Sequence, residues 1–204
     1  MHDVESLIDQ LRPYVASERV LGAIAAVPRE CFVPGPLRDR AYENRALAIG
    51  CGQTISQPLV VARMTEMLAP GPEDRVLDVG TGSGYHAAVL AQLARHVWSI
   101  ERHDRLSRRA ARNLAAAGVH NVTLVVGDGT RGLPESAPYD AINVAAAGTT
   151  EGLAELEEQL AVGGRLIAPI TDPLQRLSLT RRTHAGLERE LLEEVRFVPL
   201  VRDD

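Results

Sequence analysis

The sequence predicts an α/β fold in which a doubly wound, mostly parallel sheet carries helices on both faces. An N-terminal helical cap precedes this sheet, and antiparallel strands complete it at the C-terminus. Between residues 75 and 170, short apolar runs alternate with segments of helical periodicity, the pattern of consecutive strand–helix–strand units. One apolar run leads directly into a glycine loop that opens a helix. After residue 175, two strand-like runs follow each other with no helix between them, which indicates an antiparallel end to the sheet.

The chain length suits one compact domain with an N-terminal appendage. Its 204 residues are 45% hydrophobic, which is enough to build a core. The turn-rich run APGPED, residues 69–74, is the expected boundary. It divides the chain into a cap over residues 1–70 and a main domain over residues 71–204.

Two short amphipathic helices are predicted within residues 4–27. The first has an apolar stripe between Val4 and Leu11 and ends near Pro13. Ser17 can cap the second, which carries apolar residues at helical spacing up to Val27.

The segment between these helices and the main domain is more varied. The connector PRECFVPGP is too rich in proline for regular structure, and residues 42–57 are expected to be irregular. Pro58 is suited to the first position of a helix that runs to about Ala69.

The main domain contains the alternating elements. Strands are predicted at residues 75–79, 96–101, 122–127, 139–145 and 163–170, and helices at 85–94, 104–117 and 152–160. Asp104 can cap the second of these helices, and Gly118 stands where a C-terminal capping glycine is expected. The runs RLSLTRR and LLEEVRFVPLV, residues 176–182 and 191–201, are predicted to form antiparallel strands joined through THAGLER.

Composition excludes several classes of function. All 22 basic residues are arginine, so a pyridoxal Schiff base and the usual phosphate-binding loop, which both need lysine, are excluded. A net charge of −5 without a basic run argues against a nucleic-acid partner. The N-terminus is acidic and amphipathic rather than a signal peptide, and no apolar run approaches the roughly 18 residues of a membrane span. A cytoplasmic protein without a membrane partner is expected.

Cysteine and histidine spacing gives no metal site. Cys31 and Cys51 stand alone, which is typical of reduced thiols in a cytosolic protein. The six histidines also lack ligand spacing. Four of them are expected at the surface or at helix ends: His86, His96, His103 and His120.

The strongest local signal is the run VLDVGTGSGY, residues 76–85, in which a strand meets a glycine loop. Gly80, Gly82 and Gly84 let the backbone approach a ligand closely, and the helix that follows offers free N–H groups to an anion. In the dinucleotide fingerprint G-x-G-x-x-G, the third glycine comes one position later. The spacing in this chain therefore disfavours a nicotinamide cofactor, and a purely structural turn is also compatible with it.

Two acidic residues at strand ends support a nucleoside-containing ligand. Glu101 ends the second central strand, 21 positions after Gly80, where a carboxylate can accept both ribose hydroxyls. Asp128 follows the third strand between two glycines, where it can meet the edge of an adenine. The glycine loop, Glu101 and Asp128 therefore form one set of candidate ligand-binding residues at neighbouring strand ends.

This set resembles the class I S-adenosylmethionine-dependent methyltransferases, whose fold is Rossmann-like. The resemblance implies that the loop holds the methionine part of S-adenosylmethionine, Glu101 the ribose and Asp128 the adenine. Asp78 would support the loop or the methionine amino group, and an alternative role for it is to cap the glycine turn. The cofactor-binding residues expected on this basis, with no metal, are Asp78, Gly80, Thr81, Gly82, Ser83, Gly84, Glu101, Gly127, Asp128 and Gly129.

Further segments resemble one family of this class. No tetrad of the D/N-P-P-Y type follows the fourth strand, which argues against an enzyme that methylates the amino groups of bases. In chain order, VPRECFVP, AYENRALAIGCGQTISQP, GTGSGYHAAVLA, GDGTRG, QLAVGGRLIAPI and RFVPL are similar to protein-L-isoaspartate O-methyltransferases. QTISQP and RFVPL are more specific than the glycine loop, and together the segments cover nearly the whole chain.

The family resemblance implies an activity and its partners. Members transfer a methyl group from S-adenosylmethionine to the α-carboxylate of L-isoaspartyl residues in damaged proteins and peptides. The ester then closes to a succinimide, which can hydrolyse to normal aspartate. The product of the cofactor is S-adenosylhomocysteine, and a monomer is expected.

The resemblance places the acceptor site in residues 1–70 and the cofactor in residues 71–204. Ser56 would be the catalytic residue, and a helix cap ahead of Pro58 is its alternative role. The residues expected to bind substrate are Thr54, Ile55, Gln57 and Val198. A carboxylate has an ordinary pKa of about 4 and needs no general base at neutral pH. Small hydroxyl and amide donors are therefore sufficient to orient it.

Two departures from the family pattern leave the acceptor open. The fourth strand carries Asn143 and Ala145 without the usual threonine and the proline that follows, and TDPLQR at 171–176 replaces a glycine-rich turn. One alternative is a relative that methylates an ordinary aspartate in a biosynthetic precursor peptide. A protein that binds S-adenosylmethionine without catalysis is a second alternative, and a nicotinamide oxidoreductase is a third.

Overall fold

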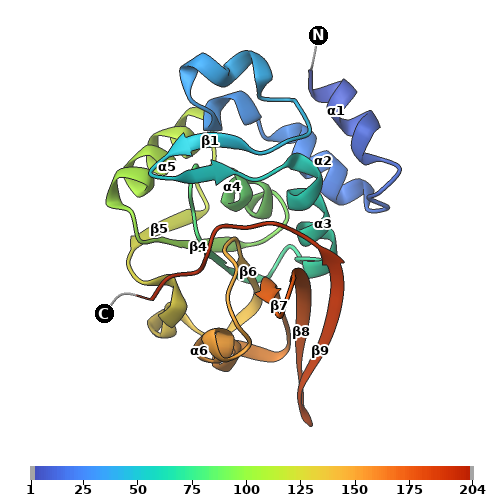
Figure 1. The fold of residues 1–204 in the computed structure, drawn as a ribbon, viewed down its shortest axis with the longest axis vertical. Coiled ribbons are helices and arrows are strands. Elements are labelled where there is room, and N and C mark those ends of the chain that lie inside the picture. Colours follow the sequence, from blue (N-terminus) through green and yellow to red (C-terminus); the bar gives the residue numbers. More distant parts are fainter. Residues whose placement is uncertain (1–2, 203–204) are drawn as a thin grey trace.

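The computed structural model describes residues 3–202 and has the predicted α/β architecture (Figure 1). A seven-stranded sheet has the order β5-β4-β3-β6-β7-β8-β9. Its strands are β3 (Arg75–Val79), β4 (His96–Glu101), β5 (Val122–Val126), β6 (Tyr139–Val144), β7 (Leu160–Thr171), β8 (Gln175–Thr183) and β9 (Gly186–Glu194). The pairings from β5 to β7 are parallel, and those of β8 with β7 and β9 are antiparallel. The predicted Rossmann-like sheet with an antiparallel end is confirmed.

Helices cover both faces of the sheet. The α-helices are α1 (Val4–Leu11), α2 (Glu18–Ala26), α3 (Pro58–Leu68), α4 (Tyr85–Ala91), α5 (Asp104–Ala116) and α6 (Ala154–Glu158). Single 3₁₀ turns are η1 (Arg29–Phe32), η2 (Gly35–Arg40), η3 (Gly129–Arg131), η4 (Pro134–Ser136) and η5 (Glu151–Leu153). Because successive strand residues face opposite sides, Val76 belongs to the buried cluster that includes residues of α1 to α5, and Leu77 belongs to the cluster that includes residues of α6.

The N-terminal helices share their core with the sheet. Leu7 of α1 and Ile24 of α2 belong to the same buried cluster as Val76 of β3 and Val97 of β4. Figure 1 shows α1, α2 and the η1–η2 segment gathered at one end of the molecule. The division of the chain at residue 70 stays a prediction.

Several predicted helix signals are confirmed. Ser17 caps α2 by accepting a hydrogen bond from the Val20 N–H at 3.4 Å, and Pro58 is the first residue of α3. Gly118 follows α5 with φ +70°, a left-handed conformation that suits glycine. The predicted Asp104 cap is wrong: His103 is the capping position of α5 without a side-chain bond, and Asp104 pairs with Arg108 instead.

Residues 42–57 are not irregular throughout, as the sequence suggested. They contain an antiparallel hairpin of β1 (Leu47–Gly50) and β2 (Gln53–Ile55). The turn is possible because Gly50, Cys51 and Gly52 have φ values of 94°, 52° and 70°. The strands have only four and three residues, and their apolar side chains are limited to Leu47, Ala48, Ile49 and Ile55, so the alternation was easily missed.

Strand boundaries in the second half of the chain also differ from expectation. β7 begins at Leu160, before the paired glycines, which lie in an irregularity of its pairing with β6. The helix expected at 152–160 is divided into η5 and the short α6. β9 begins at Gly186 and ends at Glu194, so residues 195–201 leave the sheet instead of extending the predicted strand.

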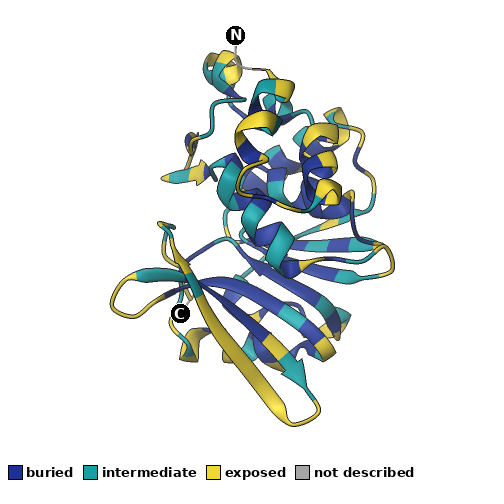
Figure 2. Cartoon of the chain, turned by 90° about the vertical axis from the view of Figure 1, so that its right-hand side faces the viewer, coloured by how far each residue is buried: buried dark blue, intermediate teal, exposed yellow. Residues whose placement is uncertain are grey.

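The β8–β9 hairpin projects from the body of the molecule (Figure 2). All residues of β9 are exposed except the half-buried Leu192, and both Leu187 and Leu191 face solvent. Elsewhere, Cys31 and Cys51 are free thiols. Within residues 3–202 no helix is long and apolar enough to cross a membrane, and no cluster of His, Cys, Asp or Glu could hold a metal ion.

Candidate active site

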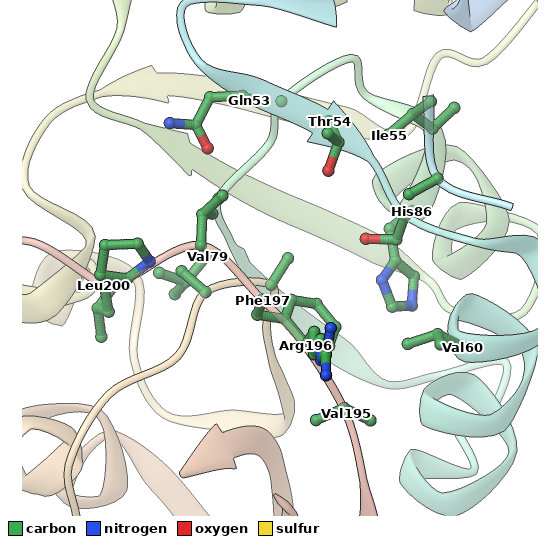
Figure 3. Close-up of a pocket in the computed structure, with 18 of the residues that line it drawn as sticks. Gln53, Thr54, Ile55, Val60, Val79, His86, Val195, Arg196, Phe197 and Leu200 are labelled. Carbon is green, nitrogen blue, oxygen red and sulfur yellow. The ribbon is translucent and has the colours of Figure 1, made fainter. Parts of the chain in front are cut away.

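A cavity of about 1160 Å³ lies at the carboxyl ends of β3 and β4. Parallel sheets bind ligands at this edge, where the chain crosses from one side of the sheet to the other. The hairpin strand β2 and the start of α3 form a second wall, and residues 194–201 form a third. Figure 3 shows Gln53 and Thr54 on one side of this space, with Phe197 and Leu200 of the C-terminal segment opposite them.

Most of the residues predicted from the sequence meet in this cavity. Those that line it are Thr54, Ile55, Ser56, Gln57, Gly80, Thr81, Gly82, Ser83, Glu101, Gly129 and Val198. Four others do not form part of its lining: Asp78, Gly84, Gly127 and Asp128. The acceptor segment and the glycine loop, more than twenty residues apart in sequence, therefore share one space.

The glycine loop turns tightly over the end of β3. Gly80, Gly82 and Gly84 all have positive φ, and the Gly80 N–H donates to the Ile100 carbonyl of β4 at 2.9 Å. A side chain on Gly80 would meet Ala145 of the neighbouring β6 segment at 3.6 Å, so strain in φ rather than space selects glycine there. The result is a bare backbone on the cavity wall.

Glu101 is held at the end of β4 by two backbone donors. Its Oε2 accepts from the Gly82 N–H and its Oε1 from the His103 N–H, both at 2.9 Å. The side chain is only 6% exposed yet lines the cavity. This carboxylate therefore connects the glycine loop to the start of α5 and has lone pairs left for a ligand.

Asp128 has a structural role that is visible without a ligand. Its Oδ1 accepts from the N–H and the hydroxyl of Thr130, so it caps the turn η3. The next residue, Gly129, lines the cavity, and a side chain there would come within 2.6 Å of Val79 Cγ1. Contact between Asp128 and an adenine remains a prediction.

Asp78 lies beneath the cavity in a buried hydrogen-bond network. Its Oδ1 accepts from Asn143 Nδ2 and its Oδ2 from the Ser99 hydroxyl, each at 2.7 Å. The Ser99 hydroxyl also contacts that of Thr81 at 2.6 Å. Burial raises the pKa of Asp78 to about 6, although the bonds from Ser99 and Asn143 oppose the shift.

The raised pKa of Asp78 predicts that the free energy of unfolding depends on pH. A protonated Asp78 favours the folded state, and this contribution is lost as the pH rises from its ordinary pKa of 3.8 through about 6. Asp78→Asn is expected to increase the free energy of unfolding at pH 7.5 by about 2–3 kcal/mol, with the gain vanishing near pH 4. Urea denaturation across this range measures it. Asp39→Asn, at an exposed carboxylate, is the control, and a gain that does not depend on pH would contradict the prediction.

His86 is the main cavity residue that the sequence did not identify. It stands near a helix end as expected, but its ring is directed inward rather than to the protein surface (Figure 3). Nδ1 lies 3.1 Å from Asn143 Nδ2, and Nε2 lies 3.1 Å from the Thr65 hydroxyl, which itself donates to the Val61 carbonyl. These partners assign the proton to Nε2. Burial lowers the pKa of His86 to about 3, so the ring is neutral at physiological pH.

Ser56 stands between β2 and the first residue of α3. Its expected alternative role as a helix cap is wrong, because Gln57 is the capping position and makes no side-chain bond. The Ser56 hydroxyl has no hydrogen-bond partner within residues 3–202, whereas its backbone carbonyl accepts from Arg29 at 2.7 Å. The hydroxyl is therefore available to a molecule in the cavity.

The C-terminal wall is fixed mainly by backbone bonds. The Val198 carbonyl accepts from the Ala147 N–H at 2.8 Å, and the Leu200 N–H donates to the Ala147 carbonyl at 2.7 Å. Gln175 holds the preceding turn, since its Oε1 accepts from the Phe197 N–H at 2.6 Å. Gln175 lies in the run TDPLQR, which was noted only as a departure from the family pattern. No sequence pattern pointed to Ala147, because it acts through contacts between distant segments.

Comparison with known proteins identifies a single family. Residues 2–204 match the family model described as protein-L-isoaspartate(D-aspartate) O-methyltransferase. A protein-L-isoaspartate O-methyltransferase from Rhodospirillum centenum is 51% identical over 191 residues, covering 93% of this chain and 86% of the relative. A protein of the same name from Aeromonas hydrophila is 47% identical over 202 residues and covers 98% of each chain.

Solved structures agree with the fold. A protein-L-isoaspartate O-methyltransferase superposes with a TM-score of 0.86 at 32% identity, covering 97% of this chain and 65% of that longer chain. A β-aspartate methyltransferase from Plasmodium falciparum, solved with S-adenosyl-L-homocysteine, gives a TM-score of 0.86 at 24% identity over 100% of each chain. At that identity the second likeness concerns the fold alone.

Proposed function

The chain belongs to the protein-L-isoaspartate(D-aspartate) O-methyltransferase family, and on this premise we propose that it methylates L-isoaspartyl residues of damaged proteins and peptides. The methyl donor is S-adenosylmethionine, and the resulting ester starts repair by closing to a succinimide. The observation that carries the proposal is the single cavity in which the acceptor segment at Ser56 faces the glycine loop at Gly80.

The residues of the cofactor half fit S-adenosylmethionine. Gly80 and Gly82, both at positive φ, present backbone without side chains to the cavity where the methionine part would lie. Glu101 reaches the cavity with a carboxylate already oriented by two N–H groups, which suits a pair of ribose hydroxyls. We assign Asp128 and Gly129 to the adenine end, and Asp78 to the support of the loop from below.

The chemistry that the cofactor supplies is a methyl group on a sulfonium, which leaves a neutral thioether. The acceptor carboxylate is already ionised at neutral pH, so the chain needs no general base. Ser56 donates its hydroxyl to one carboxylate oxygen and directs the other oxygen toward the methyl group. A neutral donor orients the carboxylate without the strong stabilisation of its charge that a paired arginine would give.

His86 does not supply the missing base. Both ring nitrogens are bonded within the protein, and its low pKa keeps the ring neutral without leaving a free lone pair toward the acceptor. The walls formed by the hairpin and by residues 195–201 instead serve to align the reactants and to exclude water. We assign Thr54, Ile55, Gln57 and Val198 to the peptide around the reacting carboxylate.

An assay with matched peptides tests this function. The protein is incubated with methyl-labelled S-adenosylmethionine and two peptides that differ only in carrying isoaspartate or aspartate at one position. A base-labile methyl ester is expected on the isoaspartyl peptide alone. Absence of ester on that peptide would refute the proposed activity, and ester on the aspartyl peptide would redirect it to an ordinary aspartate.

The other functions considered from the sequence are not favoured. Relatives that match almost the whole chain carry the isoaspartate name, and the acceptor segment that a mere cofactor-binding protein would not need is intact. A function as a nicotinamide oxidoreductase is inconsistent with membership of a methyltransferase family. We also propose a monomeric cytoplasmic enzyme without nucleic-acid or membrane partners, which the net charge of −5 supports.

A further inference from the structure

Arg29 is a fully buried cation close to the proposed acceptor site. It begins the turn η1, is 0% exposed, and has no ion pair within residues 3–202. Nε donates to the Ala41 carbonyl at 2.9 Å and Nη2 donates to the Ser56 carbonyl at 2.7 Å. The guanidinium carbon stands 4.5 Å from the centre of the Tyr85 ring.

A buried guanidinium without a carboxylate is costly. Burial lowers the pKa of Arg29, yet an arginine remains protonated in proteins, so the charge itself is buried. Nη1 has no hydrogen-bond partner among the described residues, and neither has the Tyr85 hydroxyl. An apolar side chain would fill a core position at lower cost, which indicates that the two carbonyl bonds and the ring contact have a use beyond packing.

The contacts of Arg29 connect the two halves of the site. Ser56 belongs to the acceptor segment between β2 and α3, while Tyr85 is the first residue of α4, directly after the glycine loop. Arg29 itself does not line the cavity. It therefore acts from behind the wall, on the backbone of one half and on a side chain of the other.

The bond to the Ser56 carbonyl also orients the next N–H group. The Ser56–Gln57 peptide is trans, so its N–H points opposite to its carbonyl, away from Arg29. Ser56 and Gln57 line the cavity, and the Gln57 N–H makes no hydrogen bond within residues 3–202. A carbonyl held by a cation polarises its peptide group, which makes this N–H a stronger donor.

We propose that Arg29 is a positioning residue for the acceptor carboxylate. Its guanidinium lies over the Tyr85 ring and donates to the Ser56 carbonyl, and in this way it fixes the Ser56 hydroxyl and the Gln57 N–H at a set distance from the glycine loop. The two donors then meet the carboxylate without rearrangement. This inference rests on the proposed function for its substrate, but the positioning of the segment is a property of the free protein.

Three variants test the proposal. Arg29→Met keeps most of the side-chain volume and removes all donors, while Arg29→Lys keeps the charge but replaces the planar guanidinium by a single nitrogen. Phe32→Leu is the matched control, because Phe32 lies in the same turn, is fully buried and packs against the Tyr85 ring with 5.6 Å between the ring centres. Its phenyl ring has no hydrogen-bond donor for the Ser56 carbonyl. The measurements are kcat and KM with an isoaspartyl peptide, the Kd of S-adenosylhomocysteine, and amide hydrogen exchange over residues 53–57.

Arg29→Met is expected to lower kcat by about 10- to 100-fold, the scale of a misplaced reacting group, with the Kd of S-adenosylhomocysteine unchanged. Arg29→Lys should recover part of kcat. Exchange over residues 53–57 should accelerate in Arg29→Met and not in Phe32→Leu, which should lose stability but keep kcat. If Arg29→Met does not fold, Arg29→Lys alone must show the fall in kcat and the faster exchange.

The proposal is overturned if Phe32→Leu reproduces the loss of kcat, if cofactor affinity falls in parallel with kcat, or if exchange over residues 53–57 is the same in all variants. A wild-type protein that forms no ester on isoaspartyl peptides refutes the proposed function instead. In that case, the comparison of amide hydrogen exchange between the variants still decides whether Arg29 holds residues 53–57 in place.

Discussion

Glu101→Ala is expected to weaken the binding of S-adenosylmethionine and S-adenosylhomocysteine by about 100-fold. The lost interaction is a pair of charge-assisted hydrogen bonds to the ribose, together worth about 3 kcal/mol, and each 1.4 kcal/mol is tenfold in Kd. The substitution also removes the acceptor of the Gly82 and His103 N–H groups, so the glycine loop loses an anchor. Isothermal titration with S-adenosylhomocysteine measures the change.

Two control variants distinguish the loss of a contact with the ribose from a general destabilisation of the protein. Glu101→Gln keeps one acceptor oxygen and should fall between the wild type and the alanine variant. Glu73→Ala removes an exposed carboxylate from the same domain and should leave the Kd unchanged. An unaltered Kd in Glu101→Ala, or a loss matched by Glu73→Ala, would show that Glu101 does not hold the ribose.

Ser56→Ala is expected to lower kcat for isoaspartyl peptides by about 10- to 100-fold. A hydrogen bond from a neutral donor to a charged acceptor contributes about 1.5–3 kcal/mol, and each 1.4 kcal/mol is tenfold in rate. The hydroxyl is unpaired within residues 3–202, so its loss leaves no protein group unsatisfied. The Kd of S-adenosylhomocysteine should stay the same, because the cofactor half is untouched.

Steady-state kinetics with labelled cofactor measure the effect of Ser56→Ala. Ser56→Thr retains a hydroxyl and should keep more activity than the alanine variant. If both Ser56→Ala and Glu101→Ala lost cofactor affinity equally, the division of the cavity into an acceptor half and a cofactor half would be wrong.

The fold was largely predictable because its signals are local. Strand runs such as RVLDV alternate with helical periodicity, and the closely spaced Gly80, Gly82 and Gly84 indicate a tight turn, in which all three have positive φ. The β1–β2 hairpin was missed because its strands are short and its turn includes Cys51, a residue that rarely adopts φ of 52°. The strand propensities of individual residues carry little information about secondary structure in such a short segment.

The cavity was predictable in part, for a different reason. Residues such as Glu101 follow directly from their place at a strand end, since parallel strands share one edge. Arg29 and His86 act through partners 27 and 57 positions away in the chain, Ser56 and Asn143. The hydrophobic periodicity of a sequence does not reveal a contact between two residues that lie so far apart in the chain. A buried arginine in a proline-rich connector resembles a surface residue until the packing around it is known.

The outer strand β9 forms an open edge of the seven-stranded sheet. One edge of β9 is unpaired within residues 3–202, and its two exposed leucines would favour β-pairing with a second molecule. Four glutamates, Glu188, Glu190, Glu193 and Glu194, place charge along that strand and oppose such pairing. The negative charge along β9 is therefore an electrostatic barrier to edge-to-edge aggregation at the open side of the sheet.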